Sequence, residues 1–499
     1  MIRIWKGVEK VAIKRVLCVI LSLVILAGCL MVGTWAETEI DPKTDSVKTV
    51  YVSDGGSAEN NGLTRETPVP YLNTAIKIIN DAAAADPAIK QGKIVLVGDI
   101  TPGVTSSYNF GELTQLDPYE IPLTITAETR ADGDGKQRYS IILKLSGKTH
   151  GDAVRGLLIG GFTTFENIGL DMQNGRGVIY ENCKGLIMGT NITVVTPSKT
   201  YISIGYQNVD ASKTETKLGN SYIEVHSGSY NRLHLVPHYQ GKYSMGNLTV
   251  IAENCTFTGT GIDMCTVNWA AGEYVVNGDI NILLDNVSFT GSNGRVQLGL
   301  ASDVQSYQIN GNIFVRAVGL VGLGKQGNPV PVNFGKKVTF AEGCGLRVSR
   351  PDSIARYVSA PSGDDRVKAV GDLSCLPTLA GYQDNRAKSE GETYSARFVA
   401  TIPMLDGLSK VGFEITPKIG DNSGVTQTVE GTTVYSSIQA LDESVTATSL
   451  GGRYIYALEI KNIPVAITEV EYTVTPYVID SNGNRVNGLT KTITVSAAS

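Results

Sequence analysis

The sequence predicts an all-β protein in which a parallel β-helix is followed by an antiparallel β-sandwich. A short unit of an acidic residue, an asparagine and an apolar residue recurs over the first two thirds of the chain, as expected for a solenoid of stacked coils. Strand-like runs replace helical periodicity after residue 90. From residue 378 onward, apolar and polar residues alternate between short turns, which is typical of an antiparallel sheet.

The composition is that of a globular protein. The 499 residues include 55 Gly and 18 Pro, and 18% of them are charged, which argues against a disordered chain, a collagen and a multi-span membrane protein. A net charge of −5 argues against binding to nucleic acid. The four histidines, without an HExxH or paired CxxC motif, argue against a transition-metal site, whereas a Ca²⁺ site built from oxygen ligands stays open.

Residues 1–36 have the layout of a secretory signal peptide, which predicts an exported protein. Five cations within residues 1–15 precede an uncharged apolar run over residues 16–32, which is short for a transmembrane helix of about 20 residues. Residues 26–29 (LAGC) resemble a bacterial lipobox, which implies cleavage before Cys29 and a lipid anchor on its thiol. Residues 34–36 (TWA) offer an ordinary cleavage site before Glu37, so anchorage and free secretion are both open.

The chain then opens with a strand, a turn rich in Gly and Asn, a short helix and a second strand. Apolar residues at 72, 75, 76 and 79 are spaced three and four apart, which predicts a helix with one buried face. Residues 49–52 and 93–99 read as the flanking strands. This order resembles the entry of secreted right-handed parallel β-helix proteins of the pectate-lyase-like group. The resemblance implies a right-handed solenoid over residues 45–350, with the helix capping its open end.

The repeat unit supports a solenoid. We expect its apolar residues to point into the coil, and its asparagines to take the left-handed bend between short sheets and to stack as a ladder. The unit occurs at residues 165–170 (FENIGL), 180–183 (YENC), 252–259 (AENCTFTG) and 284–291 (LDNVSFTG). Strand-like runs lie at residues 121–125, 140–145, 191–195, 222–226, 247–251, 280–284, 313–318 and 338–340.

A second domain is expected after the coil. Residues 351–377 carry Pro, Ser, Gly and charge, which predicts a linker or cap. Residues 378–499 alternate around turns such as 480–484 (DSNGN), which predicts a β-sandwich of immunoglobulin type. The phrases RFV, VGFE and TPYV in this region resemble an accessory module on exported proteins of anaerobic Gram-positive bacteria. Strands are expected at residues 394–402, 410–416, 433–438, 454–460, 471–478 and 489–495.

The densest group of polar side chains lies between residues 222 and 242. Strand alternation puts Tyr222, Glu224 and His226 on one face, opposite Ile223 and Val225. This group is the candidate functional site, and its other members are Asn231, Arg232, His234, His238, Tyr239 and Lys242.

Two interpretations of this group stay open. In the pectate-lyase-like enzymes, an Arg or Lys acts as the base while carboxylate-bound Ca²⁺ acidifies the proton beside a uronate. The resemblance therefore implies Arg232 or Lys242 as the base and Glu224 as a cation ligand. The alternative is a set of solvated, outward-facing residues beside a loop.

Two further features are candidates for binding. Asp54, Asn60 and Asn61 offer oxygen ligands for Ca²⁺, although the same residues suit a plain turn before a helix. Trp269 with Tyr239 and Tyr243 offers aromatic rings for a sugar, although a tryptophan that fills a loop explains the pattern as well.

The sequence leaves three classes of function. Residues 161–168 (GFTTFENI) and 223–230 (IEVHSGSY) resemble adhesin-like surface proteins of gut-type anaerobes, which carry no recognisable catalytic set. The leading hypothesis is an exported, non-catalytic protein that binds glycans or other surfaces. The alternatives are a Ca²⁺-dependent lyase acting on an acidic polysaccharide, which requires Arg232, Lys242 and Glu224 to converge, and a passive spacer. The expected ligand-binding residues are His226, His234, His238, Tyr239 and Trp269.

Overall fold

The computed structural model describes residues 46–496 with short gaps, and the chain divides into two compact units. One unit holds Thr44–Leu373 with Thr448–Gly452, and the other holds Ser374–Ala447 with Arg453–Ser499. The gaps in the described range are residues 109–110, 131–136, 146–155, 174–176, 181–184, 205–214, 237–240, 265–271, 292–293, 300–304, 319–321, 324–327, 330–331, 336, 350–357, 360–364, 370–375, 386–392, 432–433, 437–439, 443–444 and 465–466.

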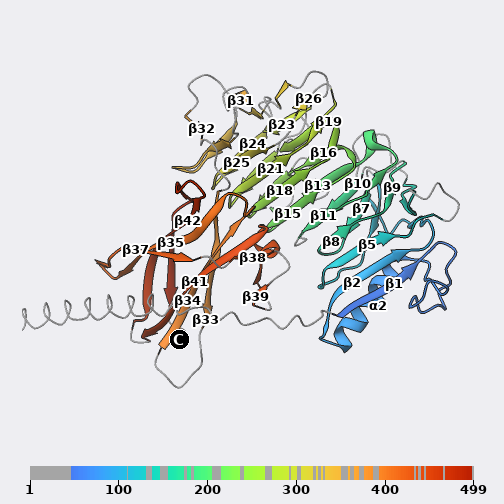
Figure 1. Ribbon diagram of the computed structural model, residues 1–499, viewed down its shortest axis with the longest axis horizontal. Helices are drawn as coiled ribbons and strands as arrows, with labels where there is room; N and C mark the ends of the chain where they lie inside the picture. Colours follow the sequence, from blue (N-terminus) through green and yellow to red (C-terminus); the bar gives the residue numbers. More distant parts are fainter. Residues whose placement is uncertain are drawn as a thin grey trace, which may run out of the picture. The chain divides into compact units, whose positions relative to one another are not determined.

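The first unit is a parallel β-helix, as the repeats predict. Its strands stack coil upon coil from the blue to the yellow end of the ribbon (Figure 1). Sheet A has 11 strands in the described residues, and each of them is parallel to its neighbours. In order they are β1 (Ser46–Val52), β2 (Ile89–Leu96), β5 (Leu123–Ala127), β8 (Thr163–Phe165), β11 (Leu186–Met188), β15 (Ser221–Val225), β18 (Leu248–Glu253), β21 (Ile280–Asp285), β25 (Ile313–Val318), β30 (Leu346–Ser349) and β32 (Val367–Ala369).

Three more sheets complete the coil in the described residues. Sheet B holds β3 (Ser106–Tyr108), β4 (Gly111–Gln115), β7 (Gly156–Ile159), β10 (Gly177–Tyr180), β13 (Tyr201–Ile204), β16 (Ser229–His234), β19 (Thr256–Met264), β22 (Ser288–Phe289), β23 (Arg295–Leu298), β26 (Gly322–Leu323), β27 (Asn328–Pro329), β28 (Val332–Phe334) and β31 (Val358–Ser359). Sheet C holds β14 (Thr216–Lys217), β17 (Gly241–Met245), β20 (Gly272–Val276), β24 (Gln305–Ile309) and β29 (Val338–Phe340). Sheet D holds β6 (Ser140–Ile142), β9 (Gly169–Asp171) and β12 (Thr193–Val194).

The core runs along the inside of the coil as rows of apolar side chains in register. Ile223, Val250, Ile282 and Val315 pair in sequence across β15, β18, β21 and β25, and each is at most 1% exposed. Because every coil buries its apolar row only against its neighbours, the stack is stabilised coil by coil. Ile168, Val287 and Phe289 of the repeat units are fully buried in the same core, which confirms that apolar residues of the repeat point inward.

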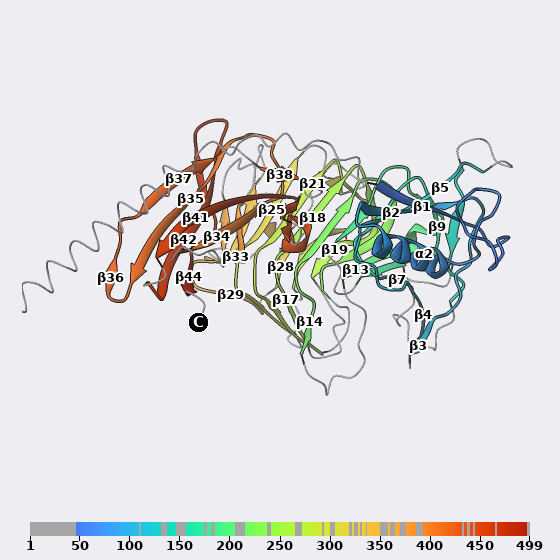
Figure 2. The same ribbon diagram turned by 90° about the horizontal axis from the view of Figure 1, so that it is seen from below.

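A short helix lies at the N-terminal end of the coil, as predicted. It is α2 (Leu72–Ala85), and it packs against β1 and β2 (Figure 2). The four apolar residues expected to form its inner face are all buried, namely Leu72, Ala75, Ile76 and Ile79. The described residues also include the 3₁₀ turns η1 (Pro197–Lys199) and η3 (Thr448–Leu450), and none of the described helices has the length and apolar character needed to cross a membrane.

The described asparagines of the repeat, Asn167, Asn254 and Asn286, occupy left-handed turns and form ladders, as predicted, whereas Asn182 lies outside the described residues. Asn167, Asn191, Asn254 and Asn286 have φ between 48° and 56°. Asn286 donates from Nδ2 to Oδ1 of Asn254 at 2.6 Å, and Asn191 donates to Asn167 at 2.9 Å. Each ladder links the same bend of two successive coils, so the asparagine both permits the turn and connects it to its neighbour.

We expect Asn254→Ala to destabilise the coil more than Asn254→Gly. Both variants lose the amide that Asn286 contacts, but only alanine must hold a Cβ at φ 50°, which costs about 1–2 kcal/mol. Urea unfolding should therefore place the midpoint of the alanine variant below that of the glycine variant. Equal midpoints would contradict the role of the left-handed bend.

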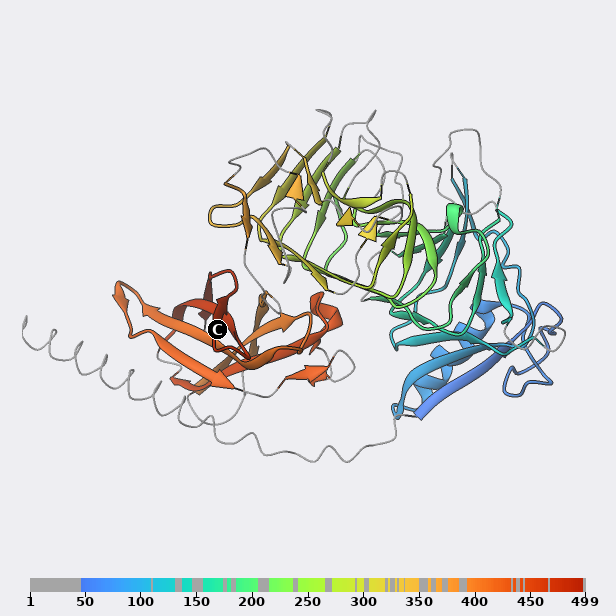
Figure 3. The same ribbon diagram turned by 45° about the horizontal axis from the view of Figure 1, so that its top comes forward.

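The second unit consists of two antiparallel sheets that share one core (Figure 3). Phe398 contacts Tyr472 at 5.2 Å between ring centroids, and Phe413 contacts Tyr456 at 5.0 Å, so each pair joins one sheet to the other. The first sheet holds β33 (Thr378–Asn385), β34 (Thr393–Ile402), β38 (Tyr435–Ser436) and β41 (Tyr454–Pro464). The second holds β35 (Leu408–Ile419), β36 (Asn422–Ser423), β37 (Gln427–Gly431), β42 (Glu469–Asp480), β43 (Arg485–Asn487) and β44 (Lys491–Ser496). Outside these two sheets, β39 (Ala440–Asp442) and β40 (Val445–Thr446) form an antiparallel pair of their own.

The coil extends further along the chain than the end near residue 350 that the composition suggested. Strand β32 pairs in parallel with β30, with Leu346 opposite Val367 and Val348 opposite Ala369. The segment 351–377, expected as a linker or cap, therefore contributes a strand to sheet A. The Pro, Ser and Gly content of this segment predicted a linker, and a strand of only three residues is too short to stand out in such a composition.

Candidate functional site

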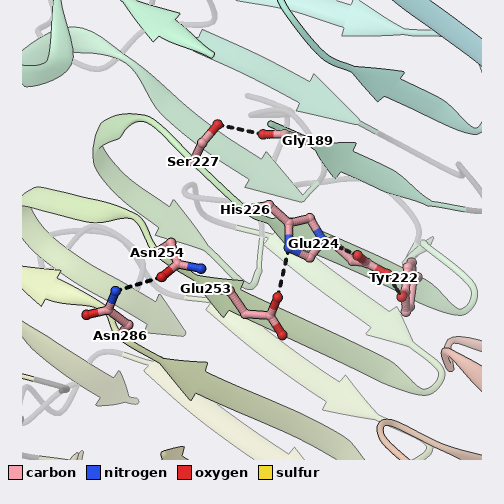
Figure 4. A network of polar contacts seen from close by, with 8 residues as sticks. All are labelled: Gly189, Tyr222, Glu224, His226, Ser227, Glu253, Asn254 and Asn286. Atoms are coloured by element: carbon pink, nitrogen blue, oxygen red, sulfur yellow. Dashed lines mark hydrogen bonds and ion pairs between the residues drawn. The ribbon is translucent and has the colours of Figure 1, made fainter. Parts of the chain in front are cut away.

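One polar cluster lies on the outward face of sheet A. Tyr222 and Glu224 project from β15, His226 follows that strand, and Glu253 ends the neighbouring strand β18. The Tyr222 hydroxyl donates to Oε1 of Glu224, and Nε2 of His226 contacts Oε2 of the same carboxylate (Figure 4). Nδ1 of His226 lies 3.0 Å from Oε2 of Glu253. Strand alternation brings Tyr222, Glu224 and His226 together as predicted.

The two carboxylates set the protonation state of His226. Hydrogen bonds to Glu224 and then to Glu253 raise the pKa of His226 from 6.5 to about 9, and burial opposes them only in part. At neutral pH the imidazole is therefore a cation that donates to a carboxylate from each ring nitrogen. Glu224 is only 5% exposed, and its carboxylate is engaged by both Tyr222 and His226. This arrangement suits a fixed ion-pair network better than a calcium ligand.

A second polar row lies on the outward face of sheet B, and each of four successive coils contributes one residue to it. The strand registers place Ser203 of β13, His234 of β16, Asp263 of β19 and Gln297 of β23 side by side. Nδ1 of His234 is 2.7 Å from Oδ1 of Asp263, and both residues are at most 2% exposed. The Ser203 hydroxyl makes no hydrogen bond within the described part of the chain, so the row lacks the contact between nucleophile and base that a Ser–His–Asp triad requires.

Arg232 belongs to the neighbouring row of sheet B. Its guanidinium lies 5.3 Å from the centre of the Tyr201 ring, and its Nη1 is 3.9 Å from Oδ2 of Asp263. The Tyr201 ring in turn meets the His234 ring edge-on at 5.8 Å. Arg232 is therefore held by an aromatic face and a buried carboxylate.

Lys242 lies on a third sheet. It projects from β17 of sheet C and forms an exposed ion pair with Glu273 of β20, at 2.9 Å from Nζ to Oε2. Glu224, Arg232 and Lys242 thus occupy sheets A, B and C respectively, and the structure does not bring them to one strip of the coil. His238, Tyr239, Trp269 and Cys29 lie outside the described residues.

In the loop considered for Ca²⁺ binding, the side-chain oxygens of Asp54 and Asn61 accept hydrogen bonds from the backbone of the coil. The Asp54 carboxylate accepts the Thr101 N–H at 3.0 and 2.9 Å, and Asn61 Oδ1 accepts the Leu63 N–H at 3.0 Å. Asn60 Nδ2 donates to the Pro68 carbonyl at 2.9 Å. Across the described residues, no three His, Cys, Asp or Glu side chains are grouped so that they could hold a metal ion.

Sequence reasoning missed the partners that complete both clusters. Glu253 and Asp263 follow their histidines by 27 and 29 residues, which is one coil. The signal that points to Glu253 is its place in the repeat unit AENC, one coil after the corresponding segment of β15. Finding these pairs needs the register between coils, which a single copy of each strand does not supply.

Fold and site together define a class: a parallel β-helix that carries histidine–carboxylate pairs between coils and is followed by an antiparallel β-sandwich. Comparison with protein-family models, with curated proteins and with solved structures finds no match to this chain.

Proposed function

We propose that this protein is an exported β-helix protein of the bacterial surface that binds glycans without cleaving them. The observation that carries the proposal is the separation of Glu224, Arg232 and Lys242 onto three sheets, because a lyase needs its base and its cation ligand at the same substrate atom. The histidine and carboxylate side chains of sheet A are bonded to one another, which suits a scaffold.

Export forms part of the proposal and rests on the N-terminal sequence. Residues 1–36 supply the signal peptide, and Cys29 supplies the point at which a lipid would hold the protein at the membrane surface. Cleavage before Glu37 would release it instead. In either case the coil faces the outside of the cell, where glycans are the abundant ligands.

We expect the purified protein to leave acidic and neutral polysaccharides intact while it binds a glycan array. The test incubates the protein with each polysaccharide and Ca²⁺, and follows unsaturated ends by ultraviolet absorbance and reducing ends chemically, with a known lyase as the positive control. Unsaturated product that disappears with a chelator would replace the proposal by a Ca²⁺-dependent lyase. Reducing ends alone would indicate a hydrolase, and no binding to any glycan would favour a passive spacer.

A further inference from the structure

An uncharged groove opens at the N-terminal end of the coil, away from both polar clusters. Its cavity of about 260 Å³ is bounded by the turn into α2 on one side and by residues 100–105 on the other. Both α2 and the nearby strand β4 belong to this end of the coil (Figure 2). None of the described residues that line the groove is ionised at neutral pH, and those that carry the argument are Tyr71, Leu72, Thr74, Ile100, Val104 and Leu116.

Two large apolar side chains are exposed at the rim of the groove. Tyr71 is 61% exposed and Val104 is 46% exposed, whereas Leu72, Ile100 and Leu116 beneath them are at most 4% exposed. An aromatic ring displayed beside a buried apolar floor is a surface that binds the C–H face of a flat, partly apolar ligand. The half-buried Thr74 makes no side-chain hydrogen bond within the described residues, which leaves its hydroxyl for a ligand.

The wall that carries Tyr71 is fixed in place. Asn73 donates from Nδ2 to the Gln115 carbonyl at 3.0 Å and to the Asp117 carboxylate at 3.2 Å, and it accepts the Asp117 N–H at 3.1 Å. These bonds join the first turn of α2 to the end of β4. They fix the backbone next to Tyr71, so that on binding only the torsions of its own side chain have to be ordered.

We propose that this groove binds one or two neutral sugar residues of a glycan, with the Tyr71 ring stacked against the sugar face. The inference rests on the proposed glycan-binding function and adds its location and ligand class. The described residues of the lining include no ionised group, which favours an uncharged sugar, because a uronate would lose the hydration of its carboxylate without gaining a cationic partner there. The cavity lies below the volume of about 300–1,000 Å³ typical of drug-sized ligands, which fits a short sugar unit.

The test titrates the full-length protein, by calorimetry, with cellotetraose, β-1,4-mannotetraose and β-1,4-galactotetraose, and with tetragalacturonate as the acidic counterpart. We expect a neutral tetrasaccharide to bind and Tyr71→Ala to weaken it at least about tenfold. Tyr382→Ala is the matched control, because Tyr382 is also exposed, at 42%, and lies in the other unit. Its affinity should equal that of the unmodified protein.

A second variant closes the groove without removing a contact. A Cβ added at Gly103 would meet no atom within 4 Å, so Gly103→Leu is tolerated by the backbone and is expected to weaken sugar binding as well. Binding of a neutral sugar that neither Tyr71→Ala nor Gly103→Leu changes would overturn the groove and leave the proposed function standing. Binding of tetragalacturonate alone would overturn the neutral ligand, and binding of none of the four would count against both groove and function.

Discussion

Replacing Tyr274 by alanine is expected to lower the free energy of unfolding of the coil by about 3–5 kcal/mol, the largest effect of a single substitution considered for this protein. Tyr274 is 2% exposed and lies at the centre of a ladder of three rings on sheet C. Its centroid is 5.3 Å from that of Tyr243 and 5.2 Å from that of Tyr307, and both pairs are stacked. Truncation removes both stacks and leaves a cavity in the core.

Urea unfolding followed by far-ultraviolet circular dichroism checks this expectation. Tyr71→Ala serves as the matched control, since the same truncation at a ring that is 61% exposed should change the midpoint little. Tyr274→Phe retains the stacked ring, so its urea midpoint should lie between those of Tyr274→Ala and the unmodified protein. If Tyr274→Ala unfolded at the same urea concentration as Tyr71→Ala, the ladder would not be a source of stability.

The repeat predicted the coil because its signal is local. A left-handed bend favours asparagine because of the backbone of that one turn. The turns at Asn167, Asn254 and Asn286 can therefore be predicted without knowing which strands lie beside them. The same holds for the apolar stripe of α2. The end of the coil was harder to place, because a strand as short as Val367–Ala369 has too few residues to show alternation.

The candidate site was only partly predictable because one coil passes around the whole circumference. Successive coils are offset by 27, 32 and 33 residues along the ladder of Asn220, Asn247, Asp279 and Asn312. Glu224, Arg232 and Lys242 fall within one coil, so they are close in sequence yet lie on three different sheets. Conversely, His226 and Glu253 are neighbours in space because they are one coil apart. The variable offset prevents a constant period from revealing such pairs.

The ion pairs of His226 should make the stability of the coil depend on pH. Its pKa is raised to about 9 in the folded protein and is about 6.5 in the unfolded chain. The stabilisation is therefore fully present below pH 6.5 and is lost as pH rises through 9. A pKa rise of this size corresponds to about 3 kcal/mol, which screening by water at the partly exposed Glu253 reduces to about 1–2 kcal/mol.

The measurement compares the unmodified protein with His226→Gln by urea unfolding at pH 6, 7.5 and 9.5. At pH 6 the unmodified protein should be the more stable of the two, because a neutral glutamine forms no ion pair with Glu224 or Glu253. By pH 9.5 most of the difference should be gone, while the groups that titrate elsewhere affect both proteins alike. A difference that stayed constant across this range would show that His226 stabilises the coil by packing, and that the carboxylates on sheet A do not hold it in the charged form.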